Sequence, residues 1–448
     1  MYSPTPRGRA KAPVRIVHLG LGNFFRAHTC WYTEHAPDAD QWGIAAFSGR
    51  TDTHVAELRA QDEAYTLLVL GPEPSAEVIS ALSAVHTAGE LDAWRAYFAD
   101  PGVAIVTSSI TEGGYLRNAA GDLDLGLPGV RADVAALRAD PAGAVVATAP
   151  GKFVAGLLAR RAAGAGPLSF VPCDNVVSSG AMVRTVVTQM AAAVDPTLVD
   201  WVLDHVAFVS TMVDRITPGI TPYDHERVRA LTGRDDPAAV ATEAFTEWVL
   251  EGEFAGPRPQ WEAAGAQFTT DIVPFEHRKL WLLNGAHSTM AYLAPLRGHT
   301  TVQQAIADPV VAGWVNQWWD EAGPHLPLAE ADVRAYRAAL TARFSNPAMS
   351  DVLARIAADG SQKIPIRFVP TITAELAAGR TPTAALRAIA GWVWHVKGRS
   401  SPVNDARQAE VLALGEGTLE ESVAKVVAFL GLPDGLAGPV TTLARGLV

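Results

Sequence analysis

Short apolar runs alternate with longer amphipathic stretches through the first half of the chain. We expect β-strands where these runs are bounded by turn-forming residues, at residues 14–20, 42–47, 65–70, 103–107, 168–172 and 207–210. A helix is predicted directly after the first run, and another from about Asp52. Strands that alternate with helices indicate a parallel sheet covered on both faces, which is an α/β fold.

The pattern changes near residue 275. From there on, apolar residues recur at helical spacing, as in residues 331–344 (ADVRAYRAALTARF) and 382–398 (PTAALRAIAGWVWHVKG). A chain of 448 residues also exceeds what one hydrophobic core commonly supports. We therefore predict two domains, an α/β domain over residues 1–274 and a mainly α-helical domain over residues 275–448.

Composition and charge narrow the class of protein. With 49% hydrophobic and 19% charged residues, the chain is typical of a folded globular protein. No apolar run is long enough for a membrane helix and the N-terminus lacks a signal peptide's apolar stretch, so we expect a cytoplasmic protein without membrane association. A net charge of -11 weighs against a nucleic-acid partner. The basic stretch at residues 7–11 is expected to be a solvated tail.

Few residues are suited to bind a metal. Cys30 and Cys173 lie far apart, which excludes a disulfide framework and a thiolate zinc site. The histidines are scattered and form no HExxH motif, so metal-independent chemistry is predicted. Tryptophans such as Trp318 and Trp319 have helical spacing and are expected to pack in the core. Nothing demands a dimer, so a monomer or weak oligomer is expected.

A glycine turn follows the first predicted strand. In GLGNFFR, Gly20 and Gly22 let the backbone approach a pyrophosphate at the start of the next helix, which predicts a Rossmann-like dinucleotide-binding domain. Phe25 replaces the third glycine of GxGxxG, and a generic strand-to-helix turn would also explain two glycines. Arg26 either adds charge near the phosphates or lies on a solvated helix face.

The end of the second strand bears on the choice between NAD and NADP. Enzymes selective for NAD usually offer an acid there to the adenosine ribose. Residues 48–52 read SGRTD, so the acid is displaced or absent, and Arg50 is suited to a 2′-phosphate. NAD is the expected cofactor, with NADP left open.

Four polar residues share one side of a predicted helix at residues 276–293 (EHRKLWLLNGAHSTMAYL). With Lys279 at zero, α-helical geometry places Glu276 at about 60°, His287 at about 80° and Asn284 at about 140°. Leu283 and other apolar residues lie on the same arc, so these groups are expected to be partly buried.

This constellation fits the oxidation of an alcohol. Burial lowers the pKa of a lysine toward the range in which it accepts a proton, so Lys279 is predicted to take the hydroxyl proton. Asn284 is suited to donate to the developing oxyanion. His287 is predicted to orient the substrate and Glu276 to pass the proton to solvent. Each of these residues alone would be ordinary on a helix.

The chain resembles the polyol-specific long-chain dehydrogenases and reductases, the family of mannitol 2-dehydrogenase and fructuronate reductase. Lys279, Asn284 and His287 match the family's KxxxxNxxH signature. Further matching stretches, in the family's order, are IVHLGLGNFFRAH near the start, TSSITEGGY at 107–115, PCDN at 172–175, MVDRITP at 212–218 and DGSQKIP at 359–365.

The resemblance implies roles for individual residues. Lys279 becomes the general base, and Asn175 and Asn284 become an oxyanion pair, while Glu276 gates proton exchange. Substrate-binding residues are expected at Asp214, Arg355, Lys363 and Arg367. The predicted cofactor-binding residues are Gly20, Gly22, Asn23, Phe24, Arg26, Arg50 and Glu112.

The substrate is predicted to be a polyol, a ketose or a sugar acid. We favour interconversion of D-mannitol and D-fructose; the alternative is fructuronate reduction, because Lys363 and Arg367 are suited to pair with a carboxylate. A non-catalytic dinucleotide-binding regulator or a carbohydrate-binding module are alternatives of other classes. The regulator would be indicated by loss of the base or the amides, which are all present, and the binding module would not require the buried lysine.

Overall fold

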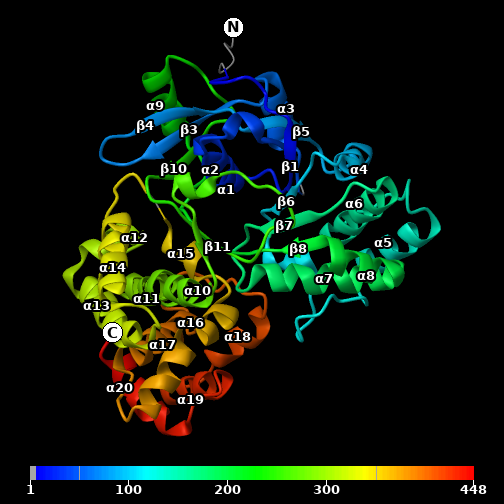
Figure 1. Cartoon of the computed structure of the whole chain (residues 1–448). Helices are drawn as coiled ribbons and strands as arrows, with labels where there is room; N and C mark the ends of the chain where they lie inside the picture. Colours follow the sequence, from blue (N-terminus) through cyan, green and yellow to red (C-terminus); the bar gives the residue numbers. More distant parts are fainter. Residues whose placement is uncertain (1–6, 50, 350) are drawn as a thin grey trace. The chain divides into compact units, whose positions relative to one another are not determined.

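The computed structural model describes residues 7–49, 51–349 and 351–448. Contacts group the chain into two units, Met1–Val273 and Pro274–Val448. In Figure 1 the first unit runs from blue to green and the second from yellow-green to red.

Among the described residues, six strands form the main sheet of the first unit. Neighbouring strands run parallel in the order β5-β2-β1-β6-β7-β8. Strand order reverses on either side of β1, and open α/β sheets bind ligands at the carboxyl ends of the strands at such a point. The strands are β1 (Val14–Leu19), β2 (Gly43–Phe47), β5 (Leu82–His86), β6 (Ile105–Ser108), β7 (Leu168–Pro172) and β8 (Val206–Phe208).

Each face of this sheet is buried in its own core. Val17 and Ala45 point into one core, which helices α4 to α8 cover. Their neighbours Ile16 and Ile44 point into the other, where α1 to α3 and two small sheets pack. The helices are α1 (Asn23–Ala27), α2 (Thr29–His35), α3 (Thr53–Ala60), α4 (Leu91–Ala99), α5 (Pro128–Ala139), α6 (Ala149–Ala163), α7 (Ser179–Val194), α8 (Thr197–His205) and α9 (Pro222–Thr232), with 3-10 turns η1 (Ala39–Gln41), η2 (Glu112–Tyr115) and η3 (Trp261–Ala264).

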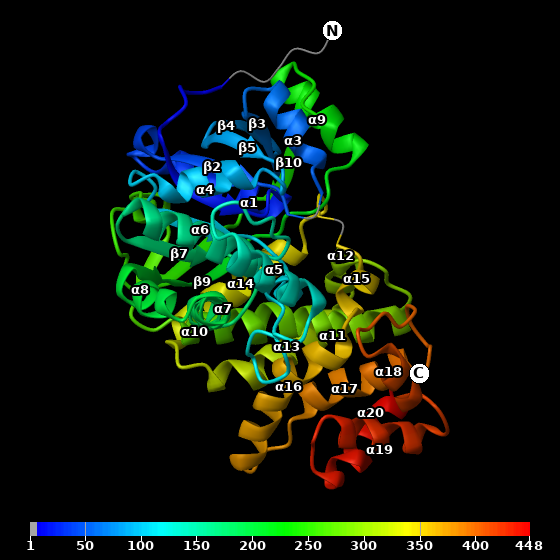
Figure 2. The same cartoon turned by 90° about the vertical axis from the view of Figure 1, so that its right-hand side faces the viewer.

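The two small sheets differ from the sequence-based prediction. The run at 65–70 is a strand, β3 (Tyr65–Leu70), but it pairs with β4 (Ser75–Ile79) and β10 (Val240–Glu243) outside the main sheet. The run at 207–210 is divided between β8 and β9 (Ser210–Asp214), and β9 pairs with β11 (Glu247–Glu251), which pairs with β12 (Gln267–Thr269). Both views show β3, β4 and β10 beside α9 (Figures 1 and 2).

The second unit is helical in its described residues. Helix α11 contacts α12, α13, α15, α16 and α17, and so lies in the middle of the unit (Figure 2). The helices are α10 (Val273–Arg278), the π-helical segment η4 (Lys279–Asn284), α11 (Gly285–Leu293), α12 (Val302–Ala307), α13 (Pro309–Ala322), α14 (Glu330–Phe344), α15 (Leu353–Ala357), α16 (Gly360–Ala377), α17 (Thr383–Val396), α18 (Gln408–Leu414), α19 (Leu419–Phe429) and α20 (Ala437–Arg445), with 3-10 turns η5 (Ala294–Arg297), η6 (Gly323–His325) and η7 (Asp434–Leu436). The predicted fold class, a Rossmann-like α/β part followed by a mainly helical part, is confirmed.

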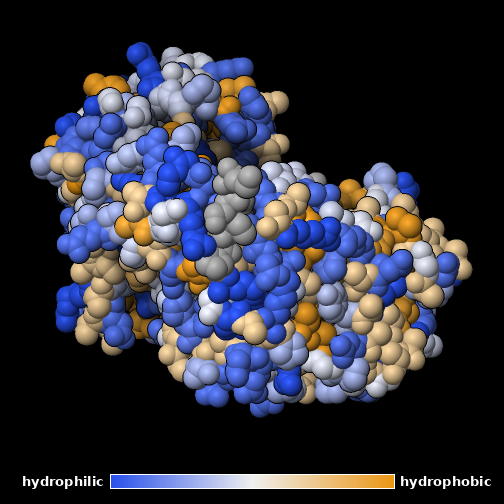
Figure 3. Space-filling model, turned by 90° about the horizontal axis from the view of Figure 1, so that it is seen from above, coloured by the Kyte–Doolittle hydropathy of each residue, from blue (hydrophilic) through white to orange (hydrophobic). Residues whose placement is uncertain are grey.

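The surface fits the acidic, charged composition. The face in Figure 3 carries mainly hydrophilic residues, with small separate apolar patches among them. No helix in the described part of the chain is long and apolar enough to cross a bilayer. The expectation of a solvated basic tail was wrong, because Arg7 donates to the carbonyls of Ser80 and Leu82 and Arg9 pairs with Glu34 at 3.3 Å.

Candidate active site

The turn after β1 lies against the turn after β6. Gly20 has φ +114°, and a Cβ there would lie 2.3 Å from the carbonyl oxygen of Ser109. Its N–H donates to the carbonyl of Phe47 at the end of β2 (2.9 Å). Only glycine fits this backbone and this close approach, so Gly20 joins the ends of three central strands.

Gly22 has a different environment. A Cβ there would meet only the Gly20 carbonyl oxygen, at 3.9 Å, and its backbone (φ -100°, ψ 176°) suits any residue. Packing within the unit therefore does not demand glycine at this position. The open space over the Gly22 backbone fits a group that must approach closely, as the phosphates of a dinucleotide do.

Phe25 fills the place of the missing third glycine. Its ring stacks on His18 of β1, with centroids 3.4 Å apart. Burial lowers the pKa of His18 to about 3, so the imidazole is neutral. Its Nε2–H donates to the Gly20 carbonyl (3.0 Å), which leaves Nδ1 to accept from the Thr107 hydroxyl (2.7 Å). A neutral His18 thus fixes the carbonyl of the glycine turn by a hydrogen bond.

The structure tests one of the two sequence-based interpretations of Arg26. Its side chain is 0% exposed, so the solvated-face alternative was wrong. The guanidinium donates to the carbonyl of Ala238 and to Asn23 Oδ1 (2.7 Å), and lies over the Tyr65 ring. These contacts join α1 to β3 and to the residues just before β10, and the role of Arg26 near the phosphates stays a prediction. The ring of Phe24 stacks on His28 at 4.9 Å.

Two further cofactor-binding predictions fall in the segments that follow β2 and β6 in the sequence. Arg50 lies outside the described residues. At the end of β2, the Ser48 hydroxyl donates to Asp52, the displaced acid. Glu112 begins η2 after β6, is exposed, and pairs with Arg117 at 2.9 Å.

A buried carboxylate joins the loops after β6 and β7. Asp174 accepts from the hydroxyls of Tyr115 and Ser108 (3.0 Å) and from the N–H of Ile110 (2.6 Å). Burial raises its pKa to about 7. Asp174 immediately precedes Asn175, a predicted oxyanion donor, which is exposed. The sequence analysis missed Asp174, although a carboxylate directly after a buried strand is a signal that could have found it.

Asp174 should make stability depend on pH. Its folded-state pKa is raised, so the folded protein keeps a proton that the unfolded chain releases, and stability falls as pH rises from its ordinary value of 3.8 to about 7. The side chain that the variant Asp174→Asn carries cannot ionise, so the variant's free energy of unfolding should not fall in this way. Measured by urea denaturation, the difference in unfolding free energy between variant and wild type should shift in favour of the variant as pH rises across this window, even if the variant is less stable at the lowest pH. Parallel stability curves for the two proteins would contradict the assignment.

Asp214 ends β9 and is buried. Its neighbour Arg215 is also buried and donates to the carbonyls of Ala27 and Glu243. The predicted role of Asp214 toward substrate stays a prediction.

The helix that carries Lys279 is not α-helical throughout, so the projection at 100° per residue was wrong here. Lys279 is the first and Asn284 the last residue of the π-helical segment η4, and the N–H of Gly285 bonds the carbonyl of Leu280, five residues earlier. In an α-helix the hydrogen-bonded pair i, i+4 lies about 40° apart, and the bonded pair i, i+5 of a π-turn is similarly aligned. The angle between the side chains of Lys279 and Asn284 around the helix axis is therefore smaller than the predicted 140°.

The groups around this segment are partly or fully buried. Glu276 on α10 is buried, while Lys279, Asn284 and His287 are partly buried. The His287 ring lies 4.9 Å from that of Phe344. The structure thus brings the four residues of the second unit onto successive turns of one helical path.

The three predicted substrate-binding cations are all engaged with protein groups. Arg367 is buried and donates from Nη1 to the Asn284 carbonyl (3.1 Å) and the Ser288 hydroxyl (2.7 Å); burial lowers its pKa to about 10. Lys363 donates to the carbonyls of Ala358 (2.5 Å) and Ile356 (3.3 Å), and burial lowers its pKa. Arg355 on α15 is exposed and pairs with Asp351.

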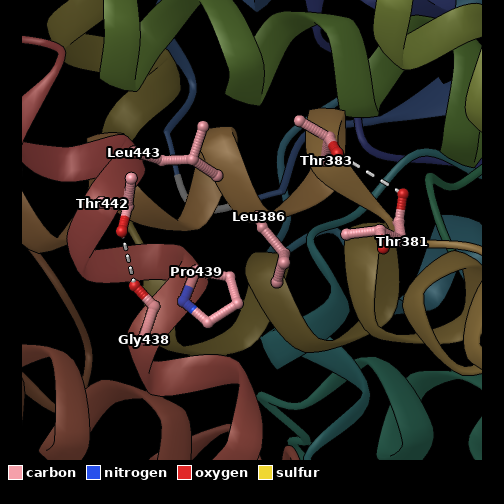
Figure 4. A pocket seen from close by; sticks show the side chains of 7 residues that line it. All are labelled: Thr381, Thr383, Leu386, Gly438, Pro439, Thr442 and Leu443. Carbon is pink, nitrogen blue, oxygen red and sulfur yellow. Dashed lines mark hydrogen bonds between the residues drawn. The ribbon is translucent and has the colours of Figure 1, made fainter.

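A separate pocket of about 500 Å³ lies between α17 and α20. Figure 4 shows its lining, which is mostly apolar, with Thr442 donating to the Gly438 carbonyl. Its side chains offer no charged group to a ligand. Among the described residues, no cluster of three or more His, Cys, Asp or Glu side chains could hold a metal ion.

Comparisons with known proteins agree with this architecture. Residues 14–263 match the mannitol dehydrogenase Rossmann domain and residues 271–437 match the mannitol dehydrogenase C-terminal domain. Fold and matches together define an oxidoreductase with a Rossmann domain. The chain belongs to the mannitol dehydrogenase family of polyol dehydrogenases, as its motifs predict.

Several relatives are similar over most of their length. The uncharacterized oxidoreductase YdfI of Escherichia coli is 36% identical over 94% of this chain and 89% of its own. D-mannonate oxidoreductase of Escherichia coli is 37% identical over 86% of this chain and 80% of its own. Mannitol 2-dehydrogenase of Cereibacter sphaeroides is 35% identical over 84% and 80%.

Solved structures give the same result. Mannitol 2-dehydrogenase of Pseudomonas fluorescens, in a ternary complex with NAD and D-mannitol, has a TM-score of 0.82 at 32% identity, covering 97% of this chain and 94% of that one. A substrate-free D-sorbitol dehydrogenase has a TM-score of 0.86 at 29% identity, covering 99% and 95%.

Proposed function

We propose that this chain is an NAD(P)-dependent, metal-independent polyol dehydrogenase that interconverts D-mannitol and D-fructose, with Lys279 as the general base. The observation that carries the proposal is the π-helical segment, which begins at Lys279 and ends at Asn284, on one helical path with buried Glu276 and partly buried His287. Membership of the mannitol dehydrogenase family supports the reaction type.

The proton chemistry follows from the side chains. As a neutral amine, Lys279 accepts the proton of the substrate hydroxyl. The Asn284 amide donates to the same oxygen as it becomes a carbonyl, and Asn175 is proposed to donate there too. His287 orients the hydroxyl, and buried Glu276 passes the proton on toward solvent.

NAD is the proposed cofactor. When bound, it supplies the hydride acceptor for the alcohol carbon. The open Gly22 backbone would hold the pyrophosphate. Asn23 and Phe24, which follow Gly22 at the start of α1, and Glu112, which begins η2 after β6, are proposed to contact the cofactor as well. The carboxylate of Asp52, five residues after the end of β2, is suited to accept hydrogen bonds from the ribose hydroxyls of NAD. Arg50 is suited to bind the 2′-phosphate of NADP, so NADP is kept as the alternative cofactor. The ternary complex of the Pseudomonas fluorescens relative supports NAD.

The hydrogen bonds of the two buried cations bear on the charge of the substrate. A carboxylate on the substrate requires a cation with free donors. Lys363 spends two of its three donors on backbone carbonyls, whereas Arg367 donates from Nη1 only, and its buried Nε has no hydrogen-bond partner among the described residues. Arg367 therefore keeps donors for a carboxylate, and the preference for mannitol rests on the similarity to mannitol 2-dehydrogenases.

Mannonate to fructuronate conversion is the second candidate. Exposed Arg355, which pairs with Asp351, offers a guanidinium to a substrate carboxylate. Similarity to the D-mannonate oxidoreductase of Escherichia coli supports this reading.

A substrate panel tests the proposal. Reduction of NAD and of NADP is followed by absorbance with mannitol, arabinitol, sorbitol and mannonate, and oxidation of the reduced cofactors with fructose and fructuronate. We expect the highest kcat/KM for mannitol with NAD. Preference for mannonate, abolished by Arg355→Gln, would establish the second candidate; no turnover on any pairing would refute the enzyme and favour a dinucleotide-binding regulator.

A further inference from the structure

Two tryptophan side chains hold the π-helical segment at its carbonyls. The indole Nε1–H of Trp318 donates to the Trp281 carbonyl, and that of Trp319 to the Leu282 carbonyl, both at 2.8 Å. Both indoles come from α13 and are fully buried. An indole can only donate, so each N–H needs such an acceptor when buried.

The carbonyls they bind belong to the segment between Lys279 and Asn284. A π-turn is an irregular form of helix that side chains can induce when they insert into the regular hydrogen-bond ladder. Arg367 adds a third donor, to the Asn284 carbonyl at 3.1 Å. External donors thus bind three carbonyls on one six-residue segment.

Local packing is built to admit these donors. A Cβ on Gly285 would lie 2.6 Å from Trp318 Nε1, so glycine lets the indole reach the backbone. Trp318 packs edge-on against Phe368, and Trp319 stacks on Phe344, whose ring contacts His287. The two indoles are therefore fixed from their far sides as well.

The form of the turn sets the direction of the reactive groups. One residue of register rotates a helix by about 100°. If η4 relaxed to the α form, Asn284 and His287 would turn by about that angle relative to Lys279 and Glu276. We infer that Trp318 and Trp319 are positioning residues, whose indole N–H groups keep Lys279 and Asn284 aligned for the reaction. The inference rests on the proposed function of those two residues.

Trp→Phe variants test it, because phenylalanine keeps an aromatic ring and removes the donor. Trp394 is the matched control, since its indole is also buried and donates to a carbonyl, that of Ala444, at 2.8 Å on α20. We expect Trp318→Phe and Trp319→Phe to lower kcat by about 10- to 100-fold with little change in the KM for the cofactor. Trp394→Phe should lose similar thermal stability but keep kcat within about twofold. Equal kcat losses in all three variants would overturn the inference.

Amide hydrogen exchange gives a readout that needs no turnover. Peptides covering residues 279–286 should exchange at least about tenfold faster in Trp318→Phe and Trp319→Phe than in the wild type or Trp394→Phe. Gly285→Ala, which displaces the Trp318 indole, should do the same. Unchanged exchange would overturn the inference even if the chain oxidised no polyol, whereas faster exchange in an inactive chain would refute only the proposed function.

Discussion

Replacing Lys279 with alanine is expected to lower kcat for polyol oxidation by about 10²- to 10⁴-fold, the usual contribution of a positioned base. Without the amine, the hydroxyl proton has no acceptor on this turn as the carbonyl forms. Cofactor affinity should be nearly unchanged, because Lys279 lies on the second unit, outside the Rossmann domain. Steady-state rates with mannitol and calorimetric titration with NAD measure the two quantities.

Lys425→Ala is the control for loss of a lysine, because Lys425 is exposed on α19 and donates to the backbone carbonyls of two exposed residues, Ala413 and Glu416. It should keep wild-type kcat. Unaltered turnover in Lys279→Ala would remove this lysine from the mechanism, and an equal loss of cofactor affinity would point instead to a defect of folding.

Gly22→Ala is expected to weaken cofactor binding without destabilising the fold. The new Cβ meets only one carbonyl oxygen at 3.9 Å, and the backbone there is extended, so the melting temperature should stay close to that of the wild type. A methyl group in the space proposed for the pyrophosphate should raise the Kd for NAD by about 5- to 150-fold, as overpacking by roughly 1–3 kcal/mol would.

Gly20→Ala serves as the contrasting variant. There the added Cβ overlaps the Ser109 carbonyl and the residue has positive φ, so the unit itself should lose stability. If Gly22→Ala bound NAD as tightly as the wild type, the pyrophosphate would not lie over this turn. If it melted like Gly20→Ala, the space over Gly22 would not be open.

Five of the six strands of the main sheet could be predicted, because its central strands are buried on both faces. Strand β5 was missed, because three of its five residues are only partly buried. The runs at 14–20 and 168–172 are mainly apolar, and they form β1 and β7. Strand β4 was missed because most of it is only partly buried and carries Ser75 and Glu77. Strand β10 was missed because its partner β3 is distant in the sequence, and such pairing is set by tertiary contacts.

The candidate site was predictable in part, for a similar reason. Spacing and resemblance indicate Lys279, Asn284 and His287 together. Periodicity assumes α-helical geometry, however, and the donors that bind the π-turn lie 37 residues further along the chain. The internal hydrogen bonds of Arg26 and Arg367 could not be predicted either, because a sequence does not tell which carbonyls a guanidinium will bind.

The most direct test of the account is the initial rate of NAD reduction with D-mannitol, measured for the wild type and Lys279→Ala side by side from about pH 6 to 10. Only a neutral amine accepts the hydroxyl proton, so the wild-type rate should rise with pH while hydride transfer limits turnover, and the variant should stay near the blank throughout. A wild-type rate that is flat over this range, or equal to that of Lys279→Ala, would contradict the account.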